Sequence, residues 1–187
     1  MNKPKTLVII QTVSKIGRVI SDVFVTFSLI MIAGCLSLII YVKNSDSDFQ
    51  KIYEYIQMFR VYQNYSVYGL YYVLTSTIIF FSWLGFLSGL SSHYFRKQLE
   101  TGHPFTTKLS KELMTLGILQ IVVPFIGAGC DYAVKLLFES VSHEYYFIDM
   151  KILFNITLGV FYILTSFICK YGTELLFKEN NSIAVNN

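Results

Sequence analysis

The sequence predicts an all-α protein, an integral membrane four-helix bundle with a short amphipathic interfacial helix. Composition is the first reason: of the 187 residues, 53% are hydrophobic and 14% are charged, whereas soluble domains are about 25% charged. The second reason is distribution, because the uncharged residues gather in four windows while the mean hydropathy is +0.51. So few charges cannot cover a soluble fold, which excludes the soluble classes.

Four windows without charged residues predict the membrane spans. A helix needs roughly 17–25 apolar residues to cross the hydrocarbon core, and each window is long enough to cross it once. The chain is predicted to form a single membrane domain, 1–187, with a disordered C-terminal tail at about 179–187. The predicted spans cover residues about 20–42, 67–91, 113–135 and 152–170.

The first window contains LIMIAGC, residues 29–35, which is similar to a bacterial lipoprotein cleavage signal. In that interpretation the mature chain would begin at Cys35. A secretory signal has an apolar stretch of about 7–15 residues and then a polar mature start. Here the apolar run continues from Leu36 to Val42, so a membrane span with Cys35 in its interior is favoured.

The segment before the second span is rich in aromatic residues. Tyrosine favours the lipid–water interface, because its ring is apolar while its hydroxyl stays hydrated. Apolar residues recur there at intervals of three and four, which is typical of a helix lying on the membrane surface. An anchoring helix on the outer leaflet is favoured over a ligand-binding aromatic box. Its apolar residues are Phe49, Ile52, Tyr53, Ile56 and Phe59.

The basic residues predict the orientation of the chain. Cytoplasmic segments of membrane proteins carry an excess of Lys and Arg. The N-terminal segment, the 93–112 connection and the C-terminal tail together hold most of the 15 Lys and Arg residues. We therefore predict a multi-pass protein of the bacterial inner membrane with both termini and the 93–112 connection in the cytoplasm.

Candidate helix-packing residues lie in the last three spans. Gly85 and Gly89 form a GxxxG pair, a shallow face that packs either within the bundle or between copies in a homo-oligomer. Pro124 cannot donate a backbone hydrogen bond to the carbonyl of Gln120, so a kink is predicted. The amides of Gln120 and Asn155 need partners at membrane depth. Helix packing is favoured for both.

The acidic residues near the spans are predicted to lie at helix ends. Asp22 precedes the first window and Asp131 follows the third. Lys135 lies one helical turn after Asp131, a spacing that permits an ion pair. With no ionisable residue predicted in the middle of a span, a transporter or channel is disfavoured.

Catalytic and metal-binding patterns are sparse. The sequence has no HExxH motif, nucleophile elbow or phosphate-binding glycine loop. His93, Glu100 and His103 have no recognised metal-ligand spacing, and the three cysteines are interpreted as small apolar residues of the spans. We predict a non-enzymatic protein with no catalytic residue, metal site or cofactor and with no direct contact to nucleic acid.

The connection between the second and third spans is the most distinctive segment. Gly102 can adopt a positive φ, and Pro104 restricts the residue before it, so the helix breaks there. Thr106 or Thr107 can then cap a new helix. Basic residues in a connection at the cytoplasmic membrane surface are attracted to the anionic inner leaflet by about 1 kcal/mol each. The candidate docking or topology elbow consists of Arg96, Lys97, Gly102, Pro104, Phe105, Lys108 and Lys111.

The turn GHPF, residues 102–105, follows a basic helix end and precedes a span that opens with LMTLGILQIVVPF. Together these features resemble a bacterial family of small four-span membrane proteins of unknown function, whose genes often lie beside helix-turn-helix regulators. The resemblance covers about half the chain. It implies the four-span topology and a cytoplasmic regulatory protein as a partner, and it implies no catalytic residue.

Three functions follow from these predictions. The first is a non-enzymatic membrane protein, surrounded by the lipid bilayer, whose cytoplasmic face binds or restrains a soluble regulatory protein. The alternative is an immunity protein that uses the Tyr-rich outer face against a membrane-active toxin. The third, a small-solute transporter or channel, is disfavoured by the uncharged spans.

Overall fold

The computed structural model describes residues 5–44, 67–102, 106–138 and 146–185. Within these ranges the chain forms long helices and no strand, which confirms the predicted all-α four-helix bundle. The predicted surface helix falls within 45–66 and so lies outside the described residues. The helices are α1 (Lys5–Asn44), α3 (Val67–Thr101), α4 (Thr107–Phe138) and α5 (Tyr146–Val185).

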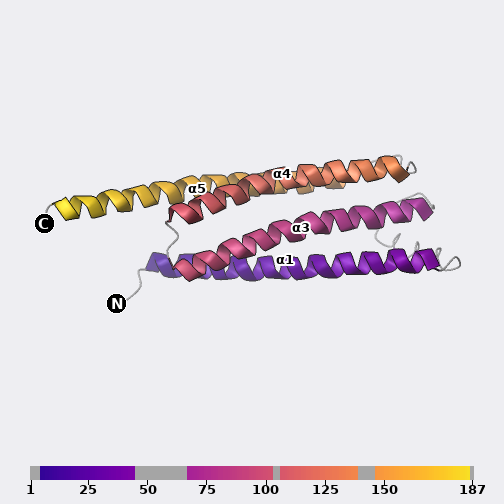
Figure 1. Cartoon of the computed structure of the whole chain (residues 1–187), viewed down its shortest axis with the longest axis horizontal. Helices are drawn as coiled ribbons and strands as arrows, with labels where there is room; N and C mark the ends of the chain where they lie inside the picture. Colours follow the sequence, from indigo (N-terminus) through magenta and orange to yellow (C-terminus); the bar gives the residue numbers. More distant parts are fainter. Residues whose placement is uncertain (1–4, 45–66, 103–105, 139–145, 186–187) are drawn as a thin grey trace.

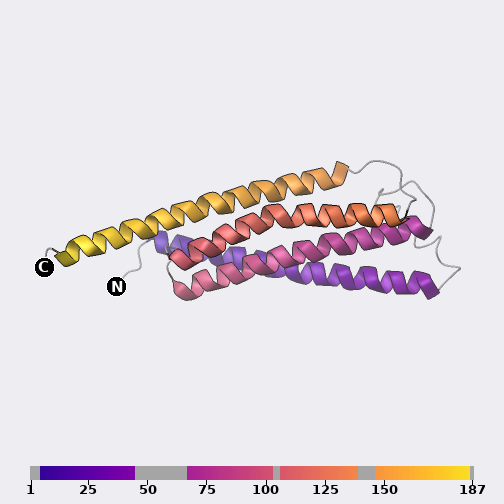
Figure 2. The same cartoon turned by 45° about the horizontal axis from the view of Figure 1, so that its top comes forward.

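The helices are arranged as two antiparallel hairpins. α1 packs on α3, and α4 packs on α5, while α3 and α4 join the two pairs. Figures 1 and 2 show that the first turn of α1 and the last turn of α5 lie at the same end of the bundle as the last turn of α3 and the first turn of α4. The start of α1, the end of α5 and the helix ends that flank the elbow are thus on one side, as an even number of spans requires.

All four helices are long and apolar enough to cross a membrane. The apolar stretches are Val8–Asn44, Leu70–Thr101, Thr107–Leu137 and Leu153–Leu175. Large apolar side chains point outward along them, such as Leu29, which is 63% exposed, and Phe161, which is 61% exposed. A soluble bundle would bury such side chains, whereas lipid tails can cover them at no cost. The structure has the helices of a multi-pass membrane protein.

The helices extend beyond the predicted spans. α1 has 40 residues, which at about 1.5 Å per residue gives roughly 60 Å, twice the hydrocarbon thickness. α5 runs to Val185, so residues 179–185 are helical where a disordered tail was predicted. The physical reason is that a charge ends an apolar window but does not end a helix. Lys and Glu are good helix formers, and no Pro or Gly follows Gly172.

The α1–α3 interface follows a repeat of seven residues. On α1 the buried positions recur at this interval, which keeps one seam facing the partner when two helices supercoil. On α3, a Cβ at Gly85 would lie 3.1 Å from the Cβ of Ser28, so the glycine allows this close approach. The small residues of the seam follow the rule that membrane helices associate through close packing. The buried series is Ser14, Ser21, Ser28, Cys35 and Val42.

The α4–α5 interface is closer still. A Cβ on Gly117 would lie 2.8 Å from the carbonyl oxygen of Gly159, so the two backbones touch. Ser110 Oγ donates to the Ser166 carbonyl at 2.8 Å, and Ser166 Oγ donates to the Ser110 carbonyl at 2.7 Å. Buried residues of α4, which face either α5 or α3, recur at alternating intervals of three and four: Ser110, Leu113, Gly117, Gln120, Pro124, Gly127 and Asp131.

The α3–α4 interface joins the hairpins through larger side chains. A Cβ on Gly127 would lie 2.6 Å from Cδ1 of Trp83, so the indole covers this glycine. Nearer the elbow, Tyr94 of α3 forms a buried cluster with Leu109, Leu113 and Leu116 of α4. These contacts fix how α3 leads into the elbow.

Candidate functional site

The elbow between α3 and α4 has a defined cap on each side. Gly102 ends α3 with a φ of 69°, and its N–H donates to the Gln98 carbonyl at 3.2 Å. Thr106 caps the start of α4, because its Oγ1 accepts from the Leu109 N–H at 3.2 Å. The glycine permits a left-handed turn, and the threonine satisfies an N–H that the new helix leaves free. Pro104 lies between them, outside the described residues.

An ion pair connects the two helices of the elbow. Lys97 Nζ of α3 lies 2.7 Å from Glu112 Oε1 of α4, and the two side chains are 34% and 28% exposed. Partial burial and a short charge-assisted hydrogen bond make it stronger than a fully exposed pair. Glu112 was not among the predicted site residues. The pair joins the helix ends on either side of the turn.

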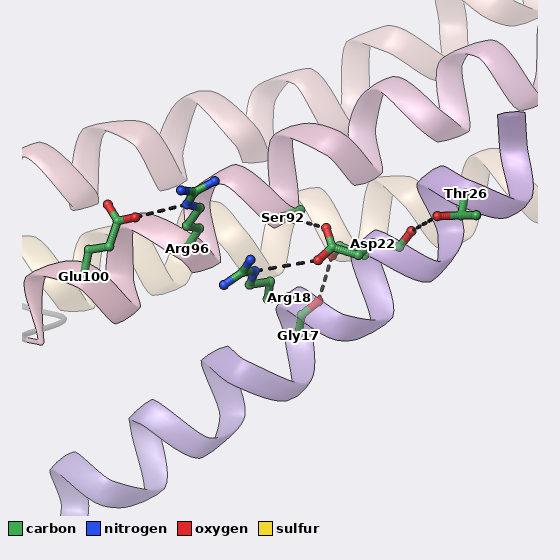
Figure 3. Close-up of polar contacts among 8 residues, drawn as sticks. Gly17, Arg18, Asp22, Thr26, Ser92, Arg96 and Glu100 are labelled. Carbon is green, nitrogen blue, oxygen red and sulfur yellow. Dashed lines mark hydrogen bonds and ion pairs between the residues drawn. The ribbon is translucent and has the colours of Figure 1, made fainter.

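The other basic residues of the elbow differ in their surroundings. Arg96 pairs with Glu100 on the same helix at 3.1 Å, and both side chains are 63% exposed (Figure 3). An exposed pair of this kind contributes little to stability. Lys108 and Lys111 are exposed on the first turns of α4. In the described part of the elbow, the positive charge that has no acidic partner therefore lies at the start of α4. Phe105 lies outside the described residues.

Two carboxylates lie inside helices where helix ends were predicted. Asp22 lies in the middle of α1, next to Arg18 at 3.6 Å, and accepts a hydrogen bond from Ser92 of α3 (Figure 3). That prediction was wrong because α1 begins at Lys5, so the charged residues before the first apolar window already belong to the helix. Asp22 thus joins α1 to α3 on the elbow side of the bundle.

Asp131 is the second of these carboxylates. It is 7% exposed and accepts hydrogen bonds from Tyr72 at 3.3 Å and from Ser76, both on α3. The prediction that it ends a helix was wrong because α4 continues to Phe138. A buried carboxylate within a membrane helix requires such donors. It connects α3 to α4 at the end opposite the elbow.

The structure places the candidate packing residues as follows. Gly85 faces Ser28 of α1. Gly89 has more space around it, because a Cβ added there would lie 3.9 Å from Val25 Cγ2. Both glycines of the GxxxG pair thus face α1. Gln120 Nε2 donates to Asn155 Oδ1 at 2.9 Å, linking α4 to α5.

Pro124 is fully buried inside an uninterrupted α4. Gln120 Oε1, one turn earlier, is buried without a hydrogen-bond partner among the described residues. The Gln120 amide thus uses its donor side for the α5 contact.

No group of three or more His, Cys, Asp or Glu side chains among the described residues could hold a metal ion. Cys35, Cys130 and Cys169 are free thiols, and Cys130 is exposed whereas the others are buried. His93 lies beside the elbow, and His103 falls outside the described residues.

Comparison of the chain with protein-family models, with curated proteins and with solved structures gives no match. The resemblance to a four-span family through the GHPF turn therefore stays a prediction.

Proposed function

We propose that this chain is a non-enzymatic inner-membrane protein whose cytoplasmic elbow docks a soluble regulatory protein. The observation that carries the proposal is the Lys97–Glu112 ion pair, which spans the turn between capped helix ends. A connection that only sets orientation needs positive charge and no fixed geometry. This elbow combines charge with a shape held by Gly102 and Thr106.

The charge of the elbow indicates the kind of partner. Lys108 and Lys111 are exposed at the start of α4, which we place at the membrane surface. Positive groups at such a position attract an acidic surface and speed its association, and salt weakens both effects. We therefore propose a partner with an acidic docking face.

The polar groups in the spans support a packing role over a solute pathway. Gln120 bonds to Asn155, and Asp131 accepts from Tyr72 and Ser76. Apart from Gln120 Oε1, these groups bond to one another across helix interfaces, as polar groups in lipid must. The protective alternative depends on the Tyr-rich segment before α3, which falls outside the described residues.

A photo-crosslinking amino acid at Thr107 tests the docking proposal in living cells. Thr107 is exposed at the elbow, so we expect one discrete crosslinked product. Its yield should fall at least about fivefold when Pro104 and Phe105 are both replaced by Ala, because every charge remains while the turn changes shape. The control places the crosslinker at Tyr171, an exposed position on α5.

Three results would contradict this proposal: no discrete product from 107, the same product from 171, or an unchanged yield in the Ala variant. Surface expression and topology of the variant are checked in parallel, so that a loss of product reports on docking.

A further inference from the structure

Beside the elbow, α3 and α4 line an open cavity of about 300 Å³. Its wall changes from polar to apolar along the helix axes. The residues nearest the elbow are polar and include Lys97 and Lys111, and those farther into the span are Leu90, Leu116 and Leu119. From Lys111 to Leu119 the helix rises roughly 12 Å. With the elbow at the membrane surface, as proposed above, the cavity runs from head-group level into the hydrocarbon region.

The charges of this wall leave an excess of one positive charge. Lys97 is neutralised by Glu112 at 2.7 Å. Lys111 is exposed at the rim, and His93 on the facing helix supplies a further donor. A phosphate diester carries one negative charge and oxygen acceptors, which complement this rim.

We propose that the cavity binds one phospholipid of the inner leaflet that has an anionic head group. The phosphate lies against Lys111, and the beginning of an acyl chain lies along Leu90, Leu116 and Leu119. A volume of about 300 Å³ is at the lower end of ligand sites, which suits a glycerophosphate and its first methylenes. A zwitterionic lipid fits less well, because its ammonium group would meet the positive rim.

The proposal stands apart from the docking function. The cavity shares Lys97 and Lys111 with the elbow, but lipid binding is measured on the purified chain with no partner present. Failure of lipid binding would leave the crosslinking result unaffected, and the converse also holds.

Native mass spectrometry of the purified full-length chain tests the site, with phosphatidylglycerol and phosphatidylcholine of identical acyl chains as probes. We expect tighter binding of one phosphatidylglycerol molecule. Lys111→Gln should weaken it about fivefold, since a lysine near anionic lipid contributes about 1 kcal/mol. Lys108→Gln is the matched control: it removes the same charge one turn earlier on α4, outside the cavity wall.

A second variant keeps every charge and fills the space. Thr115 lines the cavity and is exposed, so Thr115→Trp should abolish the tight phosphatidylglycerol site while the melting temperature in detergent stays that of the parent. Equal loss from Lys108→Gln and Lys111→Gln would overturn the proposal in favour of general surface charge. Equal binding of the two lipids, or full binding by a stably folded Thr115→Trp variant, would also overturn it.

Discussion

Gly117→Ala is expected to destabilise the protein by about 1–3 kcal/mol, the usual effect of overpacking a well-packed interface. The added Cβ would lie 2.8 Å from the Gly159 carbonyl oxygen and 3.1 Å from the backbone nitrogen of Ile163. Backbone atoms of a helix cannot move aside as a side chain can, so α4 and α5 must separate. Separation also lengthens the reciprocal Ser110–Ser166 hydrogen bonds.

Helix propensity alone would predict the opposite effect, a more stable alanine variant. Alanine favours a helix over glycine by about 1 kcal/mol, so a glycine without close neighbours should gain from the same change. Gly129 lies on the same helix with nothing within 4 Å of its added Cβ. Thermal unfolding in one detergent should therefore show Gly117→Ala melting several degrees lower and Gly129→Ala melting at or above the parent. Equal melting of both variants would refute the close α4–α5 contact.

Asp131→Ala is expected to lower the free energy of unfolding by about 1–3 kcal/mol. The change removes the acceptor that the hydroxyls of Tyr72 and Ser76 share. Since α3 and α4 join the two hairpins, loss of these hydrogen bonds weakens the contact between them. Asp131→Asn keeps the shape and one oxygen acceptor, so its effect should fall between the parent and the alanine variant.

Asp22→Ala provides the comparison for Asp131, because it removes a carboxylate whose side chain is 54% exposed. Exposed pairs contribute about 0–1 kcal/mol, so this variant should melt close to the parent. Unfolding of the three variants is followed by tryptophan fluorescence, since Trp83 packs against Gly127 at the same α3–α4 interface. An Asp131→Ala variant as stable as Asp22→Ala would contradict the buried carboxylate contact.

The apolar windows predicted the four helices but not their ends. A window stops at its first charge, and this rule placed Asp131 at a helix end although α4 continues to Phe138. Helix ends depend on capping groups and on breaks in the backbone. Where those signals stand in the sequence, as at Gly102 and Thr106, the break and the cap were predicted.

The packing partners could not be predicted from one helix at a time. The seven-residue series from Ser14 to Val42 is visible in the sequence, but it identifies no partner helix. Gly85 was expected to allow close approach, and only the arrangement of α1 beside α3 shows that Ser28 fills the space. Glu112 was missed for the same reason, because its pairing with Lys97 depends on how two helices face each other across the turn.

Substituted-cysteine labelling tests the orientation most directly, since the proposed function requires the elbow to be in the cytoplasm. Cys35, Cys130 and Cys169 are first replaced by Ala, and single cysteines are then placed at Asn44 and Thr107, both exposed and at opposite ends of the bundle. A membrane-impermeant maleimide added to intact cells should label position 44, and position 107 should react only after the membrane is disrupted. Labelling of position 107 in intact cells would contradict the cytoplasmic elbow.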